Sequence, residues 1–176
     1  MSNTAVVYPI KGSAKTELTN VGEDQFQQHC VEATCDRVFD IQGDVTIGEG
    51  FKTMPKFVPV ELKSDEKGEY WELEANHAYN FESNVTTKVA PGECFWLVHR
   101  SSFNRAGIRI FSALYDSGYE GGTNGVIYTS QNKLKLYKGT RIAQVLILTA
   151  ETMKLYQGQW QGKSIAADGS YKVENK

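Results

Sequence analysis

The sequence has few of the features that mark a metal site, a secreted chain or a membrane protein. Its only three cysteines are Cys30, Cys35 and Cys94, an odd number without a CxxC pair or a zinc-knuckle spacing. We therefore expect reduced thiols in a cytoplasmic protein. The opening residues MSNTA lack the basic and apolar segments of a signal peptide. No apolar run approaches the ~20 residues of a membrane span, so we expect no membrane partner.

An excess of charge of either sign is also absent. The chain has 19 basic and 21 acidic side chains, so we expect neither a nucleic acid nor a strongly basic protein as its partner. Its 176 residues suit one domain. A chain of this length buries roughly 70% of its unfolded surface, so it needs no disulfide or metal for stability. We expect residues 1–160 to form that domain and residues 161–176 to be a mobile tail.

Short extended segments dominate what is present, and evidence for helices is thin. Glycine-rich turn signals, Asn124-Gly125 among them, separate these segments. Alternation and β-branched residues predict strands within residues 31–41, 57–62, 70–74, 79–82, 94–98, 126–129 and 142–148. Pro59 suggests an edge strand, and residues 142–148 suit a buried central one. We expect a short helix over residues 23–30 and about one helical turn over residues 102–106. The pattern favours an all-β sandwich, jelly roll or compact barrel.

The first motif with a chemical meaning is Arg100-Ser101-Ser102, followed by Arg105. A guanidinium and two hydroxyls at the start of a helical turn can bind polyphosphate, because the first N–H groups of the turn also face the anion. The alternative is a helix capped by Ser101 or Ser102 that ends at Gly107.

The second motif is the segment YDSGYEG, residues 115–121. A carboxylate on a tight turn, here Asp116, can act as a general base toward water or hold a sugar hydroxyl. The aromatic ring of Tyr119, three residues later, can lie against the sugar. Since Asp, Ser and Gly are also the usual residues of turns, an ordinary turn is the open alternative.

The third motif is KGTRIAQ, residues 138–144, in which a glycine turn leads into an apolar strand. Gln144 stands at a polar position of this strand and can donate to a phosphate. Arg141 can do the same, or it can be the structural partner of a buried carboxylate.

Together and in this order, the three motifs resemble the dUTPase / dCTP deaminase superfamily over residues 91–148. The resemblance implies a distorted β jelly-roll barrel and a homotrimer whose three subunits share three active sites. It implies a deoxynucleoside triphosphate as substrate, with Mg²⁺ held by its phosphates and water and by no direct protein ligand.

The resemblance also implies a role for each matching residue. The catalytic residues would be Asp116 and Ser101. The phosphates would contact Arg100, Ser101, Ser102, Arg105 and Gln144. The sugar and base would contact Ser112, Asp116, Tyr119, Asn124, Val126 and Tyr128, and a hairpin over residues 121–128 would read the base through its backbone.

Two differences bear on which branch of the superfamily the chain resembles. Deaminases carry a glutamate on the strand after the aspartate turn, but residues 122–129 contain no carboxylate, and the nearest is Glu120. dUTPases usually end in a glycine-rich arm with an aromatic residue; here Trp160 and Tyr171 could provide the aromatic ring, but the sequence around them does not match the arm. We therefore expect hydrolysis of dUTP to dUMP and pyrophosphate. A dCTP deaminase and a catalytically silent nucleotide-binding protein remain alternatives.

Overall fold

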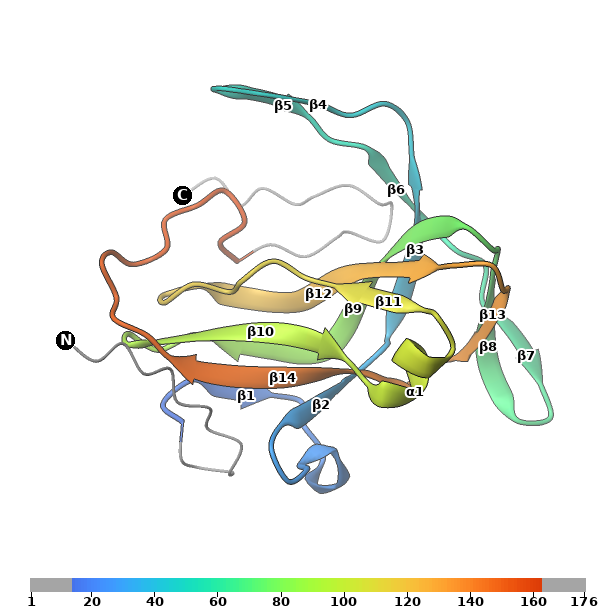
Figure 1. The fold of residues 1–176 in the computed structure, drawn as a ribbon, viewed down its shortest axis with the longest axis horizontal. Coiled ribbons are helices and arrows are strands. Elements are labelled where there is room, and N and C mark those ends of the chain that lie inside the picture. Colours follow the sequence, from blue (N-terminus) through green and yellow to red (C-terminus); the bar gives the residue numbers. More distant parts are fainter. Residues whose placement is uncertain (1–13, 163–176) are drawn as a thin grey trace.

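The computed structural model describes residues 14–162, and nearly all of their regular structure is β (Figure 1). The helical segments are a 3-10 turn, η1 (Glu23–Gln25), and a short helix, α1 (Ser101–Arg105). The strands are β1 (Glu17–Thr19), β2 (Val31–Thr34), β3 (Arg37–Gln42), β4 (Thr46–Gly48), β5 (Phe51–Thr53), β6 (Lys56–Pro59), β7 (Lys63–Asp65), β8 (Gly68–Leu73), β9 (His77–Lys88), β10 (Glu93–His99), β11 (Arg109–Phe111), β12 (Glu120–Thr129), β13 (Leu134–Tyr137) and β14 (Arg141–Thr149).

The strands form four antiparallel sheets that do not close into a complete barrel. The largest has the order β11-β12-β9-β3-β6, with β1 also paired to β9. The others are β10-β14-β2, β13-β8-β7 and the hairpin β4-β5, which projects from the body at the top of Figure 1. The first three sheets all contribute side chains to one buried apolar cluster. This is the expected all-β architecture of the jelly-roll type.

Alternating burial explains why these segments form strands. Along β14, Ile142, Val145 and Ile147 are buried in the core, and the strand has β10 and β2 on its two edges. The prediction of a buried central strand there is confirmed. The prediction of an edge strand at Pro59 is also confirmed, because β6 ends at Pro59 on the outside of the largest sheet.

The expected helix over residues 23–30 is wrong beyond its first turn. Only η1 forms, because Phe26 already pairs with Val31 in an antiparallel bridge. The segment of residues 31–41 is two strands rather than one. The chain leaves the β10-β14-β2 sheet after β2 and enters the largest sheet at β3. At the crossing, the Cys35 N–H donates to Thr140 and the Asp36 N–H donates to Glu82, so the chain contacts both sheets there.

The expected turn at Asn124-Gly125, and with it a hairpin over residues 121–128, is also wrong. These residues lie inside β12, which runs without a turn from Glu120 to Thr129. A Cβ atom on Gly125 would lie 2.4 Å from the Phe111 carbonyl oxygen and 2.9 Å from the Phe81 ring. Gly125 is therefore needed for close packing between strands, and a pattern of turn residues cannot distinguish that need from a turn.

The segment after β14 has no regular structure but packs against the domain. The Tyr156 N–H donates to the Ser117 carbonyl, and the Gly162 N–H donates to the Glu120 carbonyl. Tyr171 and nearly all of the expected tail lie outside the described residues. Within residues 14–162, no helix has the length and apolar character needed to span a membrane.

Candidate active site

Strand β10 separates two groups of the residues singled out in the sequence. Near its start, Phe95 pairs with Tyr115, which precedes Asp116. At its end, Arg100 leads into α1, which Figure 1 shows at the opposite end of the strand from the loop before β12. Arg100 follows Phe95 by five residues, so the two groups are about 15–20 Å apart at ~3.3 Å per residue. One chain therefore does not bring the expected phosphate residues to Asp116.

A cavity of about 340 Å³ lies at the Asp116 end. Its wall contains Ser112, Asp116, Tyr119, Asn124 and Val126, which are five of the six residues expected to contact sugar and base. The sixth expected residue, Tyr128, is not part of the wall: it is exposed and pairs with Arg109 on β11. The remaining lining residues are Asn80, Phe111, Ala113, Leu114, Tyr115, Gly125, Tyr156 and Trp160.

Three neighbouring strands supply one wall of this cavity. Val126 on β12 lies directly opposite Phe111 on β11 and Asn80 on β9. Directly opposed residues point to the same face of a sheet, so the three side chains form a continuous row. The sequence did not indicate Asn80, because only the pairing of β9 with β12 brings it to the cavity.

The turn that carries Asp116 is firmly held. The Tyr119 N–H donates to the Asp116 carbonyl at 3.0 Å, and Gly118 has a φ of +85°, so a β-turn forms as expected. Ser117 is buried, and its hydroxyl donates to the Glu93 carbonyl at 2.5 Å. The Asp116 side chain itself is exposed. A fixed backbone therefore presents a solvated carboxylate at the cavity.

Tyr119 is a fixed part of the cavity wall. It is buried, and its hydroxyl donates to the Gly122 carbonyl at 2.8 Å. Its ring makes edge contacts with Tyr115 and Tyr156, at centroid distances of 5.3 and 5.6 Å. Burial, reinforced by the charge of Glu82, raises the pKa of Tyr119 to about 12. Tyr119 therefore offers a fixed ring surface rather than a proton.

The backbone of Asn124 is already hydrogen-bonded. The Tyr115 hydroxyl donates to its carbonyl at 2.6 Å and accepts from its N–H at 2.8 Å. Burial raises the pKa of Tyr115 far above its usual value, so this hydroxyl keeps its proton. The Asn124 N–H is thus not available for the expected reading of the base by backbone groups.

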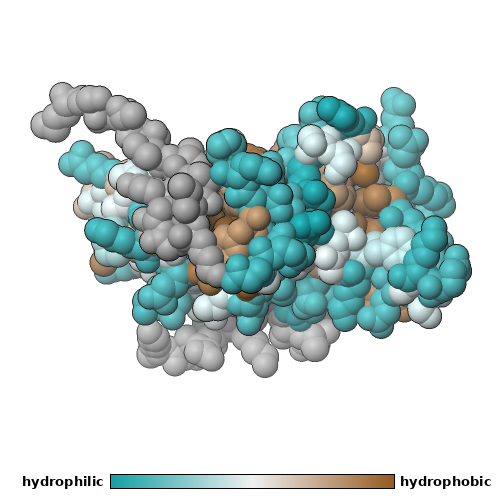
Figure 2. Space-filling model, turned by 90° about the horizontal axis from the view of Figure 1, so that it is seen from below, coloured by the Kyte–Doolittle hydropathy of each residue, from teal (hydrophilic) through white to brown (hydrophobic). Residues whose placement is uncertain are grey.

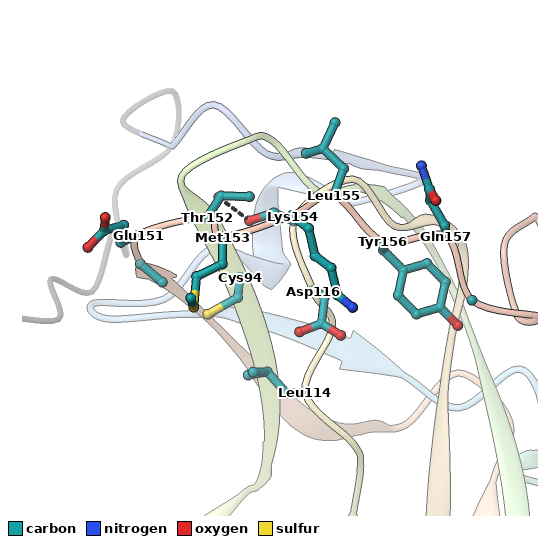
Figure 3. Close-up of a pocket in the computed structure, with 13 residues that line it drawn as sticks. Cys94, Leu114, Asp116, Glu151, Thr152, Met153, Lys154, Leu155, Tyr156 and Gln157 are labelled. Atoms are coloured by element: carbon teal, nitrogen blue, oxygen red, sulfur yellow. Dashed lines mark hydrogen bonds between the residues drawn. The ribbon is translucent and has the colours of Figure 1, made fainter.

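A second, larger cavity of about 660 Å³ adjoins the first and shares Asp116 with it (Figure 3). It lies between the start of β10 and the segment of residues 150–158, and Cys94 and Leu114 form part of its wall. Figure 3 shows the Lys154 side chain extending toward the Asp116 carboxylate. Lys154 precedes the family-like stretch of residues 156–159 and matches no motif, so sequence reasoning missed it.

At the other end of β10, Arg100 is held by a buried carboxylate. Its Nε lies 2.6 Å from Glu32 Oε1, and its Nη1 donates to the Arg141 carbonyl at 3.0 Å. The Nε of Arg141 lies 3.3 Å from the other carboxylate oxygen of Glu32. The Glu32 side chain is only 5% exposed, against 31% for Arg100 and 36% for Arg141. Arg141 is thus a structural partner of a buried carboxylate, which is one of the two roles that the sequence left open for it.

The two serines of this end are exposed and do not cap the helix. Arg100 is the N-cap residue of α1 and makes no side-chain capping bond. Neither Ser101 nor Ser102 makes a side-chain hydrogen bond within residues 14–162. The helix ends as expected, with Gly107 in the left-handed region at a φ of +75°. The hydroxyls are therefore available to a ligand, and the exposed Arg105 lies at the end of the same short helix.

Gln144 belongs to the same end, since it pairs with Val98 on β10 and Glu32 on β2. Its Nε2 donates to the Cys30 sulfur at 3.3 Å. Burial raises the pKa of Cys30, so the thiol stays neutral and is a weak acceptor. All three cysteines are buried and free.

Besides Glu32 and Glu93, Glu82 is a buried carboxylate, and it lies near the first cavity. Glu82 on β9 faces Asn124 on β12 and is ion-paired with Arg37 on β3. It does not line the cavity. Within residues 14–162, no group of three His, Cys, Asp or Glu side chains could hold a metal ion.

The sequence comparisons define the class to which this fold and site belong. The dCTP deaminase-like family matches residues 5–150. The chain belongs to that family, within the dUTPase / dCTP deaminase superfamily. A deoxyuridine 5′-triphosphate nucleotidohydrolase of Methanocaldococcus jannaschii is 26% identical over 154 residues, which cover 86% of this chain and 96% of the relative. A probable deoxyuridine 5′-triphosphate nucleotidohydrolase of Aeropyrum pernix is 32% identical over 122 residues, which cover 68% of this chain and 74% of the relative.

Two solved structures share the fold. The 2′-deoxycytidine 5′-triphosphate deaminase of Agrobacterium tumefaciens superposes with a TM-score of 0.60 at 15% identity, covering 77% of this chain and 44% of the deaminase. The dUTPase of the S. aureus phage phi11, whose structure describes a structural Mg(II) ion, gives 0.53 at 12% identity, covering 82% of this chain and 96% of the phage protein.

Proposed function

We propose that this protein hydrolyses dUTP to dUMP and pyrophosphate. The observation that carries the proposal is the first cavity, where five residues expected to contact sugar and base surround a volume suited to a nucleoside. The exposed Asp116 lies in its wall and also borders the second cavity. It is placed to accept a proton from water or to hold the sugar hydroxyl. The archaeal relatives that carry this activity in their names support the choice.

The proposal includes a homotrimer, because the site is incomplete in one chain. Arg100, Ser101, Ser102, Arg105 and Gln144 lie at the far end of β10 from Asp116, so a second subunit would supply them to the triphosphate. Arg100 keeps donors for this purpose, since two of its five N–H groups are used by Glu32 and the Arg141 carbonyl. A monomer by light scattering at micromolar concentration would contradict this part of the proposal.

Mg²⁺ belongs to the proposal as an ion carried by the triphosphate. A bound Mg²⁺ neutralises phosphate charge and keeps several waters, so it needs few protein ligands. The residues present fit that role, because the side chains expected at the phosphates are donors and, among residues 14–162, Asp116 is the one carboxylate in the wall of the first cavity. Asp116 would orient water, while Ser101 and Ser102 would donate to phosphate oxygens.

The alternative of a dCTP deaminase is favoured by the match to the dCTP deaminase-like family and by the buried carboxylate of Glu82 beside the cavity. Deamination without a metal needs a general acid and base at the ring. Glu82 is ion-paired with Arg37 and does not line the cavity, so it does not reach a ring there.

Incubation of the protein with each deoxynucleoside triphosphate and Mg²⁺, followed by chromatography of the products, tests the proposal. We expect dUMP and pyrophosphate from dUTP. Conversion of dCTP to dUTP would establish the deaminase instead, and binding without product would establish a silent nucleotide-binding protein.

A further inference from the structure

Among the described residues that line the first cavity, Asn80 is the one whose buried side-chain oxygen has no hydrogen-bond partner. It is 8% exposed and lies in the cavity wall. Its Oδ1 is sealed from solvent and has no hydrogen-bond partner within residues 14–162. Folded proteins rarely leave a buried amide unpaired, because it has lost its water without gaining a partner. Because Asn80 lies in the cavity wall, a turn of its amide that brought this oxygen to the cavity would let a ligand complete it.

The surroundings of Asn80 define the chemistry of that ligand. Val126 lies directly beside it, and Phe111 follows Val126 in the same row across three strands. Among residues 14–162, no lysine, arginine or histidine lines this cavity, so its described wall does not suit a phosphate. An uncharged ring with hydrogen-bonding groups along one edge fits both the apolar flanks and the amide.

We propose that the Asn80 carboxamide is a specificity-determining group that hydrogen-bonds the polar edge of the pyrimidine base. The inference rests on the proposed function and adds a base-reading residue to it. One atom of the amide faces the cavity at a time, and either the NH₂ donor or the oxygen acceptor matches one group of the neighbouring C=O and N–H groups of uracil. Rotation of the amide about its terminal bond lets either atom face the ligand, so the Oδ1 sealed now can be exchanged for the NH₂ group. With the Asn124 backbone already bonded to Tyr115, a side chain takes over that role.

If Asn80 reads the base, its substitution should affect ligand binding but not the stability of the fold. Asn80→Leu replaces the unpaired amide with an apolar group of similar size, so we expect the unfolding midpoint to stay the same or rise. We expect the affinity for dUMP to fall about tenfold, the order of one lost hydrogen bond. The affinity for 2-deoxyribose 5-phosphate, which has no base, should be unchanged. Asn80→Ala is expected to show the same base-specific loss, which excludes a steric effect of the leucine methyl groups.

Thr87→Val is the matched control. Thr87 is buried on the same strand β9 and has an unpartnered hydroxyl, but it does not line the cavity. It should change neither affinity. Calorimetric titration of all four proteins with both ligands distinguishes the outcomes. If the wild type binds neither ligand, both the proposed function and this inference are overturned. If the wild type binds dUMP, this inference alone is overturned by an unchanged affinity in both Asn80 variants, or by an equal loss for both ligands.

Discussion

The polar side chains near the two ends of β10 differ in whether they already have partners in the fold. At the α1 end, Glu32 pairs with both Arg100 and Arg141, so the charges are fixed before any ligand arrives. At the cavity end, the Asp116 carboxylate is exposed and Asn80 has an unpaired oxygen. A preorganised cation site suits phosphates, which bind through charge, whereas unpaired groups in a cavity suit a ligand read by shape and hydrogen bonds. On the face in Figure 2, hydrophilic residues divide the exposed apolar surface into separate patches.

The largest effect is expected at Asp116, the only group of either end that we place at the reacting water. Asp116→Asn should lower turnover of dUTP by ~10²–10⁴-fold, because an amide cannot accept a proton from water. Binding should change much less, since asparagine still hydrogen-bonds a hydroxyl and is equally acceptable in the turn. Steady-state kinetics and calorimetry on the same variant measure both quantities.

Asp44→Asn is the control, since Asp44 is an exposed aspartate next to a glycine turn far along the chain from the site. It should leave turnover unchanged. Unchanged turnover in Asp116→Asn would remove this carboxylate from the mechanism, and loss of folding would make it a structural turn residue.

The next largest effect should come from removing the ion pairs of Glu32 with Arg100 and Arg141 at the α1 end of β10. Glu32→Gln removes the buried charge that holds two arginines, and we expect the free energy of unfolding to fall by about 3 kcal/mol. Urea denaturation measures this. Glu72→Gln breaks the exposed pair with Lys63 and should cost under about 1 kcal/mol. Equal losses in the two variants would show that Glu32 is no more important than a surface ion pair.

The sequence predicted the residues that act through local geometry better than those that act through pairing. The Asp116 turn and the end of α1 at Gly107 depend on neighbours within four residues, and both are present as expected. Asn80 reaches the cavity only through the register of β9 with β12, which joins residues far apart in the chain. No local pattern encodes that register.

Two glycines also show that local sequence patterns do not reveal contacts between strands. Gly118 has the positive φ that a turn requires, and its turn was predicted. Gly125 was predicted to mark a turn as well, but it is required by the Phe81 ring and the Phe111 carbonyl on neighbouring strands. The barrel type and the assignment of site residues came from the resemblance, since short alternating strands are compatible with several all-β folds.

A smaller effect is expected at the two serines beside Arg100. Ser101→Ala and Ser102→Ala should each weaken triphosphate binding more than monophosphate binding, by about 1.5–3 kcal/mol for a hydrogen bond to a charged group. Calorimetry with a non-hydrolysable dUTP analogue and with dUMP tests this. Ser64→Ala, at an exposed position of β7, should change neither affinity. Equal losses for both ligands would show that the serines do not distinguish the added phosphates.

The smallest effect should be found at Glu93, the buried carboxylate at the cavity end of β10. Its oxygens accept from the Thr16 N–H at 2.7 Å, the Thr16 hydroxyl at 2.6 Å and the Lys15 N–H at 3.0 Å. Burial raises the pKa of Glu93, but these hydrogen bonds outweigh burial, and the net pKa is lowered. A lowered pKa means that the folded state favours the charged form more than the unfolded chain does.

The stabilisation from Glu93 is therefore fully present above the unfolded pKa of about 4.3 and is lost as the pH falls through the folded pKa. Glu93→Gln does not titrate and keeps one carbonyl acceptor, so it should lower the free energy of unfolding at pH 7 by about 1 kcal/mol. The difference between wild type and variant should shrink as the pH falls below about 4.3, which denaturant titrations at pH 7 and at acid pH would measure. Glu17→Gln, an exposed change on β1, should show no difference at either pH. A difference in unfolding free energy between wild type and Glu93→Gln that stays constant with pH would mean that the charge of Glu93 does not contribute to stability. The contrast with Glu32, whose charge pairs with two arginines at the other end of β10, would then be stronger than we infer.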